Sequence, residues 1–551
     1  MGPADLGRKD VMGASLAYPV LRTLPRMASA RAAPVALMLA VGLALAGWTP
    51  SGVPAVVRAE CGVLNVMGSL GTIDDTVYFY ALDQGAKGPW RRFGLWRTAG
   101  TPRSTKHLKD VRSGTGLYEG TVIGERLYFT AQGPRGPELW RTEGTPGSTT
   151  RVRIFGGQGS DNWDVGPAGL AVVGDTLIFT AWGPEHGMEL WRSDGTPEGT
   201  TILKDIRPGP EGSGQRWAVR TPVGDALYFT AWDGEHAGLW RSDGTTDGTT
   251  LVWELPGGLW FTGDSSTVDG SLLFLLWDEA EGRMELWRSD GTTHGTTLVQ
   301  DGLPDTDGWL TVVGHVVFWI SAFSTEEDDL ASSELWRSDG TPEGTGRVWS
   351  GAGLYGLTVV GETLYFTGDD GEHGSELWRS DGTREGTILV EDIRPGSKGS
   401  WPTYLTVVGE TLYFSANDGE HGRELWHSGG TPAGTTLVAD IRAGVQGSAP
   451  RDGTVVDGTL FFGAGDGRHG PEIWRSDGTA EGTRIVRDTR PGRKGWAVGG
   501  TSSPPDLMAV GETLYFISSR SCVEHELWRS DGTRKGTFPL LATNERGVRE
   551  R

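Results

Sequence analysis

The sequence is poor in cysteine, in positive charge and in long apolar runs, and each shortage excludes a class of protein. Only two of its 551 residues are cysteine, so at most one disulfide can form within the chain. Lys and Arg number 50 against 71 Asp and Glu, which gives a formal net charge of −21. This excess of negative charge argues against a nucleic acid or an anionic membrane as partner. The apolar run at residues 35–46 is too short to span a bilayer.

That apolar run has the features of a secretory signal peptide. Arg22, Arg26 and Arg31 precede it, and it ends in a small-x-small cleavage pattern at residues 44–46. A second candidate cleavage position follows Ala59. We therefore predict a signal peptide and leader over residues 1–59, cleaved after Ala46 or Ala59. The mature chain is expected to be secreted or to lie at the cell surface, without a transmembrane segment.

Glycine, tryptophan and repetition are what the sequence has in abundance. It contains 87 Gly and 24 Trp, and ELWRSDGTPEGT occurs letter for letter at 189–200 and 334–345. A Leu-Trp or Ile-Trp pair recurs ten times, 42 to 54 residues apart. That period is typical of a propeller blade or a helical repeat, and the β-branched and aromatic runs cut by Gly, Asp and Thr favour strands. The ten tryptophans are Trp96, Trp140, Trp191, Trp240, Trp287, Trp336, Trp378, Trp426, Trp474 and Trp528.

The unit at residues 405–442 predicts the layout of one blade. We expect strands at 405–409, 411–416, 423–428 and 435–441, joined by two tight turns and a loop. Four antiparallel strands per repeat, with no helix signal after the leader, indicate a propeller. The sequence therefore predicts an all-β protein with about ten four-stranded blades over residues 60–540 and a C-terminal tail at 541–551.

The third strand of each unit carries bulky residues on both faces, such as Leu335 and Trp336. A strand buried on both faces fits between two neighbouring blades, so we interpret the repeated tryptophan as packing between blades.

Ten blades can close as one ring or as two rings of five. No linker or change of composition divides the array between Trp287 and Trp336, so we favour a single ring. Cys61 opens the first blade and Cys522 lies in the tenth, and these blades are neighbours in one ring. We predict a Cys61–Cys522 disulfide that latches the ring where its ends meet.

The repeated stretch resembles the ELWxxDGT-repeat family of exported bacterial proteins, which are often called hyalin-like. The resemblance covers nearly all of the mature chain. It implies an exported β-propeller and carries no established activity. The DGT turn is also similar to the Asp-box of sialidases and sortilin-type propellers, although the Asp-box tryptophan follows its aspartate and here it precedes it.

The turn after ELW is the first of three motifs that could carry chemistry. Its Asp is present in seven copies, and the Thr two places later is present in all ten. A short carboxylate before Gly caps its own turn, whereas calcium needs six to eight oxygens. We therefore expect structural turns and no metal or cofactor, with calcium as the alternative. The seven aspartates are Asp194, Asp243, Asp290, Asp339, Asp381, Asp477 and Asp531.

The other two motifs are the DGEHG loop between the second and third strands and the DIRPG link between blades. A lone histidine in each of five blades is a poor zinc site, and the link arginine could simply bridge adjacent blades. In an antiparallel blade this loop and this link emerge on the edge opposite the DGT turn. We expect any ligand on their face, above all at blades seven to nine. The candidate ligand-binding residues are His186, His236, His373, His421, His469, Arg207, Arg394, Arg442 and Arg490.

The triad, phosphate-loop, zinc-protease and dinucleotide-binding patterns are all missing from the sequence. An enzyme needs a unique acid, base or nucleophile in a converging group, and the repeats supply none. We therefore predict a non-enzymatic binding or scaffold module for a glycan or protein ligand. The alternative is a divergent, sialidase-like glycosidase on a propeller, because this fold hosts enzymes and binders alike.

Overall fold

The computed structural model describes nine segments of the repeat array. They are residues 64–83, 91–114, 116–156, 166–214, 220–306, 310–323, 332–489, 507–521 and 524–540. All of the described residues belong to the unit Glu60–Arg551. Four predictions fall outside them and stay predictions: the leader at 1–59, the tail at 541–551, the Cys61–Cys522 disulfide and a ligand role for Arg490.

Each strand follows from a short local pattern. The second strand of a blade reads TLYFSA or a close variant, and in β29 (Thr411–Asn417) five consecutive side chains are buried. A run buried on both faces suits a strand that lies between two layers. Gly409 precedes this strand with a φ of 61°, a left-handed conformation that glycine adopts without strain, and so permits the tight turn.

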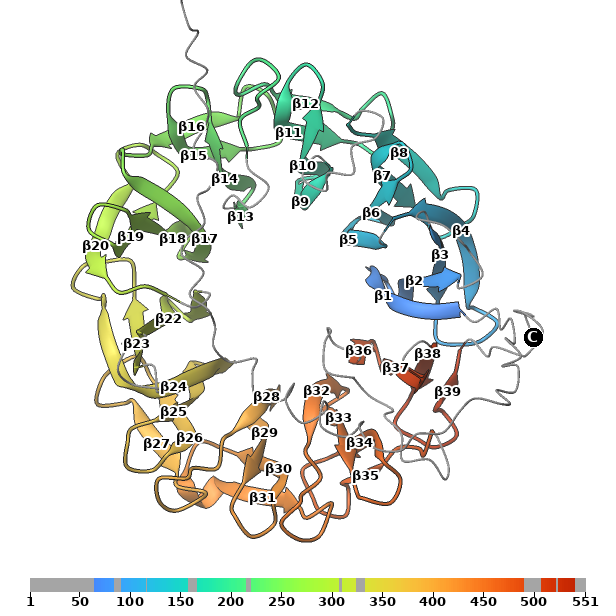
Figure 1. Ribbon diagram of the computed structural model, residues 1–551, viewed down its shortest axis with the longest axis vertical. Helices are drawn as coiled ribbons and strands as arrows, with labels where there is room; N and C mark the ends of the chain where they lie inside the picture. The colour runs from blue at the N-terminus through green and yellow to red at the C-terminus, as the bar shows by residue number, and fades with distance from the viewer. Residues whose placement is uncertain are drawn as a thin grey trace, which may run out of the picture. The chain divides into compact units, whose positions relative to one another are not determined.

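The described strands build ten blades, numbered here along the chain (Figure 1). Blades one to five contain β1 (Leu64–Ile73), β2 (Thr76–Asp83), β3 (Arg91–Thr98), β4 (Lys106–Ser113), β5 (Leu117–Ile123), β6 (Arg126–Gly133), β7 (Gly136–Thr142), β8 (Thr150–Ile154), β9 (Ala168–Val173), β10 (Thr176–Gly183), β11 (Gly187–Ser193), β12 (Thr201–Lys204), β13 (Arg220–Val223), β14 (Ala226–Trp232), β15 (Ala237–Ser242), β16 (Thr250–Glu254), β17 (Leu259–Val268), β18 (Ser271–Asp278), β19 (Arg283–Ser289) and β20 (Thr297–Leu303). Blades six to ten contain β21 (Thr311–Val313), β22 (Val316–Phe323), β23 (Ser332–Ser338), β24 (Gly346–Val360), β25 (Thr363–Asp369), β26 (Ser375–Ser380), β27 (Ile388–Glu391), β28 (Thr403–Val408), β29, β30 (Arg423–Ser428), β31 (Thr435–Ala439), β32 (Arg451–Val456), β33 (Thr459–Gly465), β34 (Pro471–Ser476), β35 (Arg484–Ile485), β36 (Leu507–Val510), β37 (Thr513–Ser521), β38 (Glu524–Ser530) and β39 (Phe538–Pro539).

The predicted blade layout is confirmed. Blade eight has the strand order β28-β29-β30-β31, with all neighbours antiparallel. Val408 pairs with Thr411 at the first turn, and Ser428 pairs with Thr435 at the DGT-type turn. Asn417 pairs with Arg423 at the opposite edge of the sheet. The loop between the second and third strands therefore lies across the sheet from the DGT turn, as expected from the order of the strands.

Blades six and seven depart from the pattern because they share one strand. β24 pairs with β23 through its first half and with β25 through its second, which joins both blades in a seven-stranded sheet. The sequence here has no DIRPG link, so the chain passes from one blade to the next without leaving the sheet. Gly353 and Gly356, with φ of 58° and 75°, lie where the register shifts.

The blades close into a single ring, which confirms the favoured arrangement over two rings of five. Ten buried hydrophobic clusters lie between successive blades. The closing cluster brings Phe79 and Trp96 of blade one against Tyr515 and Leu527 of blade ten. First strands such as β1, β5, β9 and β13 surround the centre of the ring (Figure 1).

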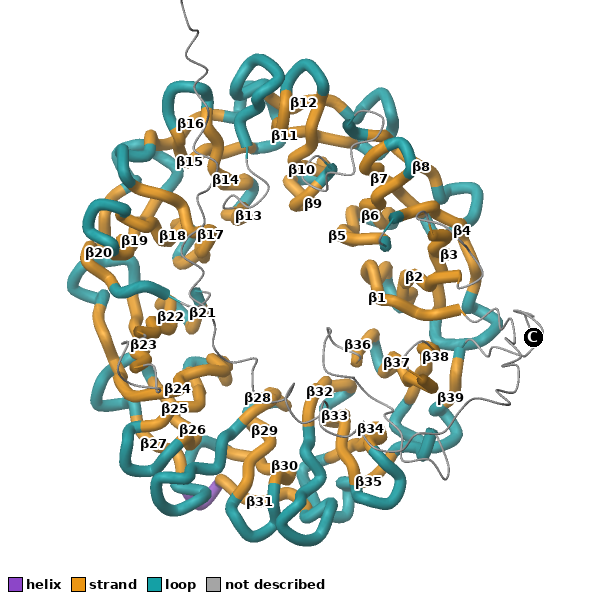
Figure 2. The backbone as a smooth tube through the Cα atoms, in the orientation of Figure 1, coloured by secondary structure: helices purple, strands orange, loops and turns teal. Residues whose placement is uncertain are grey.

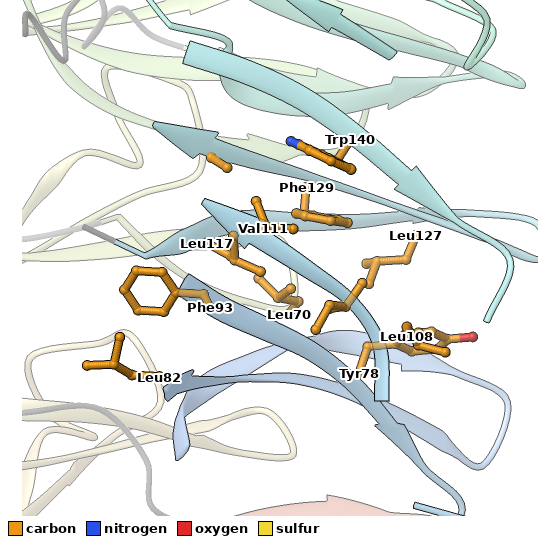
Figure 3. Close-up of a cluster of buried hydrophobic side chains, with 12 residues drawn as sticks. Leu70, Tyr78, Leu82, Phe93, Leu108, Val111, Leu117, Leu127, Phe129 and Trp140 are labelled. Atoms are coloured by element: carbon orange, nitrogen blue, oxygen red, sulfur yellow. The ribbon is translucent and has the colours of Figure 1, made fainter. Parts of the chain in front are cut away.

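Repeated tryptophans fill the space between blades, as predicted. In the cluster between blades one and two, Trp140 and Phe129 of the second blade meet Leu70 and Tyr78 of the first (Figure 3). The rings of Phe129 and Trp140 are stacked, with centroids 6.2 Å apart. Trp140 is only 8% exposed, so its contribution is removal of apolar surface from water.

Helical structure is confined to one short turn in the described part of the chain, the 3-10 helix η2 (Pro432–Gly434), which is purple in Figure 2. Across the described segments no helix has the length and apolar character needed to cross a membrane.

Candidate functional site

The DGT turns tie the chain to itself and to the preceding blade. Asp194 Oδ1 accepts hydrogen bonds from Thr196 N at 2.8 Å and Thr196 Oγ1 at 2.7 Å. These bonds hold the pKa of Asp194 below its usual value. Gly195, with a φ of 88°, lies against the Tyr128 hydroxyl of the blade before it. The same pair of bonds to Thr is made by Asp243, Asp290, Asp339, Asp381, Asp477 and Asp531.

The candidate histidines lie in separate blades, each bound within its own loop or link. Imidazole Nδ1 of His373, His421 and His469 lies 2.8, 2.6 and 2.7 Å from the aspartate three residues earlier. His186 pairs instead with a carboxylate of the following link, Asp205, at 2.8 Å. His236 uses its backbone N–H to bond the aspartate of its loop. Among the described residues no group of three or more His, Cys, Asp or Glu side chains is placed to hold a metal ion.

The candidate link arginines pack against the next blade. Arg207 lies over the ring of Trp232, with its guanidinium carbon 4.1 Å from the ring centroid. Arg394 and Arg442 lie beside Gly419 and Gly467, the glycines of the following loops. The structure thus places the loops and links together on one face, while their histidines and arginines remain divided among the blades.

Sequence reasoning missed the glutamate of ELW. In blade seven Glu376 is fully buried and accepts hydrogen bonds from Arg394 N at 3.1 Å, Ser400 N at 2.7 Å and Ser400 Oγ at 2.5 Å. Its carboxylate therefore anchors the link to the next blade. Glu189 with Ser213 and Glu424 with Ser448 repeat the arrangement. The signal in the sequence is a serine 24 residues after the glutamate.

These glutamates and the loop histidines give folding a pH dependence. Burial raises the pKa of Glu189 and Glu376 from 4.5 to about 7, which outweighs the hydrogen bonds that lower it. Hydrogen bonds to aspartate raise the pKa of His373, His421 and His469 above 6.5. In each case the folded chain binds the proton more tightly than the unfolded chain does, so protonation stabilises the fold. That stabilisation is lost as the pH rises through the pKa of the folded state.

We expect the melting temperature to be higher at pH 5 than at pH 8. Each of the two glutamates contributes at most about 3 kcal/mol to the difference. Below about pH 4 the trend should reverse, because aspartates with lowered pKa, such as Asp194, then lose their charge. Scanning calorimetry from pH 3.5 to 8 measures the effect, and the Glu189→Gln/Glu376→Gln double variant should flatten it. A melting temperature that does not fall from pH 5 to pH 8 would contradict this prediction.

One pair of residues breaks the repeat on the loop-and-link face. Trp401 and Tyr404, at the entry to β28, have φ of 55° and 57° and are 48% and 52% exposed. Bulky residues rarely hold this left-handed conformation. In blade nine Ala449 and Asp452 have the same conformations, so the backbone is repeated but the aromatic rings are not. The segment GSWPTY, beside GSAPRD in the next unit, is the sequence signal that was overlooked.

A small recess and a guanidinium accompany this aromatic pair. The Tyr404 recess, between blades eight and nine, has a volume of about 10 Å³, close to that of one water molecule. The residues around it include Tyr404, Thr406, Ser415, Pro450, Arg451 and Gly453. Arg423 Nη1 donates to the carbonyl oxygens of Trp401 at 2.8 Å and Ser415 at 3.1 Å. We call Trp401, Tyr404, Ser415 and Arg423 the mouth cluster.

The described residues contain histidine–carboxylate pairs but no assembled Ser-His-Asp triad. None of these paired histidines also bonds a serine or threonine hydroxyl. His427 bonds Thr436 at 2.7 Å and has no carboxylate partner in the same part of the chain.

No family model and no curated protein matches this chain. Similar solved structures include a puromycin hydrolase, 14% identical over 71% of this chain and 55% of its own, with a TM-score of 0.30. A prolyl endopeptidase is 14% identical over 58% of this chain and 47% of its own, with a TM-score of 0.32. The chain thus spans about half the length of these two proteins. The β-propeller domain of the Trilobed protease from Pyrococcus furiosus is 9% identical over 88% of this chain and 99% of its own, with a TM-score of 0.32.

These structures correct the function predicted from the sequence. The predicted non-enzymatic scaffold for a glycan or protein ligand, and the sialidase-like alternative, are contradicted by several of these structures, whose propellers belong to peptidases. The prediction rested on repeated residues, and those residues build blades that proteins of different activity share. At these identities and TM-scores the likeness establishes the fold alone: the chain is a β-propeller.

Proposed function

We propose that the ring captures extended peptide segments for hydrolysis, and that Trp401 and Tyr404 receive them. The observation that carries the proposal is a pair of half-exposed aromatic rings held in left-handed backbone conformations. Such conformations cost about 1–3 kcal/mol each and collect at ligand sites. Blade nine repeats this backbone at Ala449 and Asp452, so what distinguishes blade eight is the pair of aromatic rings and their exposure.

An extended peptide suits this position. β28, which follows the aromatic pair, is the first strand of its sheet, so one of its edges has no partner within that sheet. A strand edge pairs with an extended backbone, and aromatic rings beside it stack on proline or aromatic side chains. The predicted leader would carry this activity out of the cytoplasm.

Peptide titration tests the proposal. We expect the tetrapeptide acetyl-Ala-Pro-Ala-Phe to bind the full chain, and the Trp401→Ala/Tyr404→Ala variant to bind it at least about tenfold more weakly, a loss of about 1.4 kcal/mol. Isothermal titration calorimetry measures the affinity. Trp260→Ala is the matched control, because Trp260 is 61% exposed but lies in blade five.

The same samples test hydrolysis by chromatography of the peptide products. Turnover that is lost together with binding would place cleavage in this chain. Binding without turnover would assign only the capture step to the ring. Failure of the unaltered chain to bind, or equal weakening by Trp260→Ala, would contradict the proposal.

A further inference from the structure

Arg423 is a half-buried cation whose partners are all neutral. Its Nη1 donates to Trp401 O at 2.8 Å, Thr403 Oγ1 at 3.0 Å and Ser415 O at 3.1 Å. In the described part of the chain no carboxylate forms an ion pair with it. A guanidinium has five N–H donors in a planar fork that matches a carboxylate, so this group has the chemistry to bind one.

The fold does not require an arginine at this position. The residue directly before the buried glutamate of ELW is Ser375 in blade seven and Pro471 in blade nine. Blade nine forms a four-stranded sheet, and blade seven its part of the seven-stranded sheet, without a cation at this position. Arg423 therefore occurs in the blade that carries the aromatic pair, and the repeat itself does not require it.

Ser415 adds a second polar group that lacks a partner. Its side chain is 1% exposed, and its Oγ has no hydrogen-bond partner among the described residues. The corresponding hydroxyl in blade seven, Thr367 Oγ1, donates to Pro402 O at 2.9 Å. Ser415 is one of the residues around the Tyr404 recess, whose volume is close to that of one water molecule. A buried hydroxyl without a hydrogen-bond partner destabilises the fold, and a hydrogen bond to a ligand oxygen removes that cost.

We propose that the mouth cluster binds the free carboxyl end of a peptide, with the carboxylate on Arg423 and Ser415 and the last side chain on Trp401 and Tyr404. The inference rests on the proposed function, since it names the part of the peptide that the same site recognises. It makes the ring selective for chain ends over internal segments, because only an end carries this carboxylate.

Two peptides that differ in one group test this inference on the unaltered chain. Calorimetry compares acetyl-Ala-Pro-Ala-Phe, which has a free carboxylate, with its carboxamide at pH 7. We expect the carboxamide to bind at least about tenfold more weakly, which corresponds to one charge-assisted contact. Raising the salt concentration should weaken the free acid more than the carboxamide.

Variants then assign the contact. Arg423→Gln should bind both peptides with the weak affinity of the carboxamide, and Arg283→Gln, an exposed arginine at the start of β19, should keep the difference. Equal binding of the two peptides by the unaltered chain would overturn the inference and leave the proposed function standing. Binding of neither peptide would overturn both, and a difference that persists in a folded Arg423→Gln variant would overturn the role of Arg423.

Discussion

Replacement of Gly120 by alanine will lower the free energy of unfolding by about 3 kcal/mol. Gly120 lies in β5, where a Cβ atom would overlap the carbonyl oxygen and carbon of Leu70 in β1. The clash is with backbone, so no side-chain rotation relieves it. β1 also contacts β38 on its other side, so it cannot move away without disturbing the closure of the ring.

Chemical denaturation of the full chain, followed by tryptophan fluorescence, measures this loss. Gly147→Ala is the matched control, because a Cβ there meets nothing within 4 Å and the backbone is not left-handed. The control should unfold within about 0.5 kcal/mol of the unaltered chain. If Gly120→Ala unfolds like Gly147→Ala, the first two blades do not approach each other as closely as described.

Replacement of Glu376 by alanine should cost a similar amount, about 3 kcal/mol. The change leaves Arg394 N, Ser400 N and Ser400 Oγ without their acceptor, and each buried donor that loses its partner costs about 1–3 kcal/mol. Ser400→Ala removes one donor and should cost about 1 kcal/mol. Hydrogen exchange should show faster exchange in the link that follows β27, because that link loses its anchor.

Glu385→Ala provides the comparison for this prediction. Glu385 belongs to the same blade but is exposed in the DGT turn, so its replacement should be nearly neutral. Equal effects of the two substitutions on denaturation would contradict the anchoring role of the buried carboxyl. Together the two substitutions distinguish two contributions to stability: close backbone contact between blades, and hydrogen bonds that anchor the links.

Much of the fold could be predicted from the sequence, because short and repeated residue patterns specify its strands and turns. The strands expected at 411–416 and 423–428 lie at β29 and β30, since runs such as TLYFSA and RELWHS specify strand and burial within a few residues. The ten repeats then made the strand pattern clear, although the pattern of a single unit is weak evidence. The continuous β24 escaped prediction because the absence of a link motif does not reveal what the chain does instead.

The candidate site was harder to predict than the fold. His373 and Arg394 stand out in the sequence because they recur, and the structure holds each within a loop or against the next blade. Trp401 and Tyr404 stand out only once their backbone angles and exposure are known. The residue type alone predicts neither the backbone angles nor the exposure.

The sequence by itself determined the blade: ELWRSDGTPEGT encodes a buried strand, an aspartate-capped turn and a tryptophan for the neighbouring blade. Only the tertiary structure decided that ten blades close through Trp96 and Tyr515, that Glu376 is a buried anchor, and that Arg423 has no acidic partner among the described residues. The physical reason is distance along the chain. Strand and turn preferences act over a few residues, whereas burial, charge pairing and ring closure depend on contacts between residues far apart in sequence.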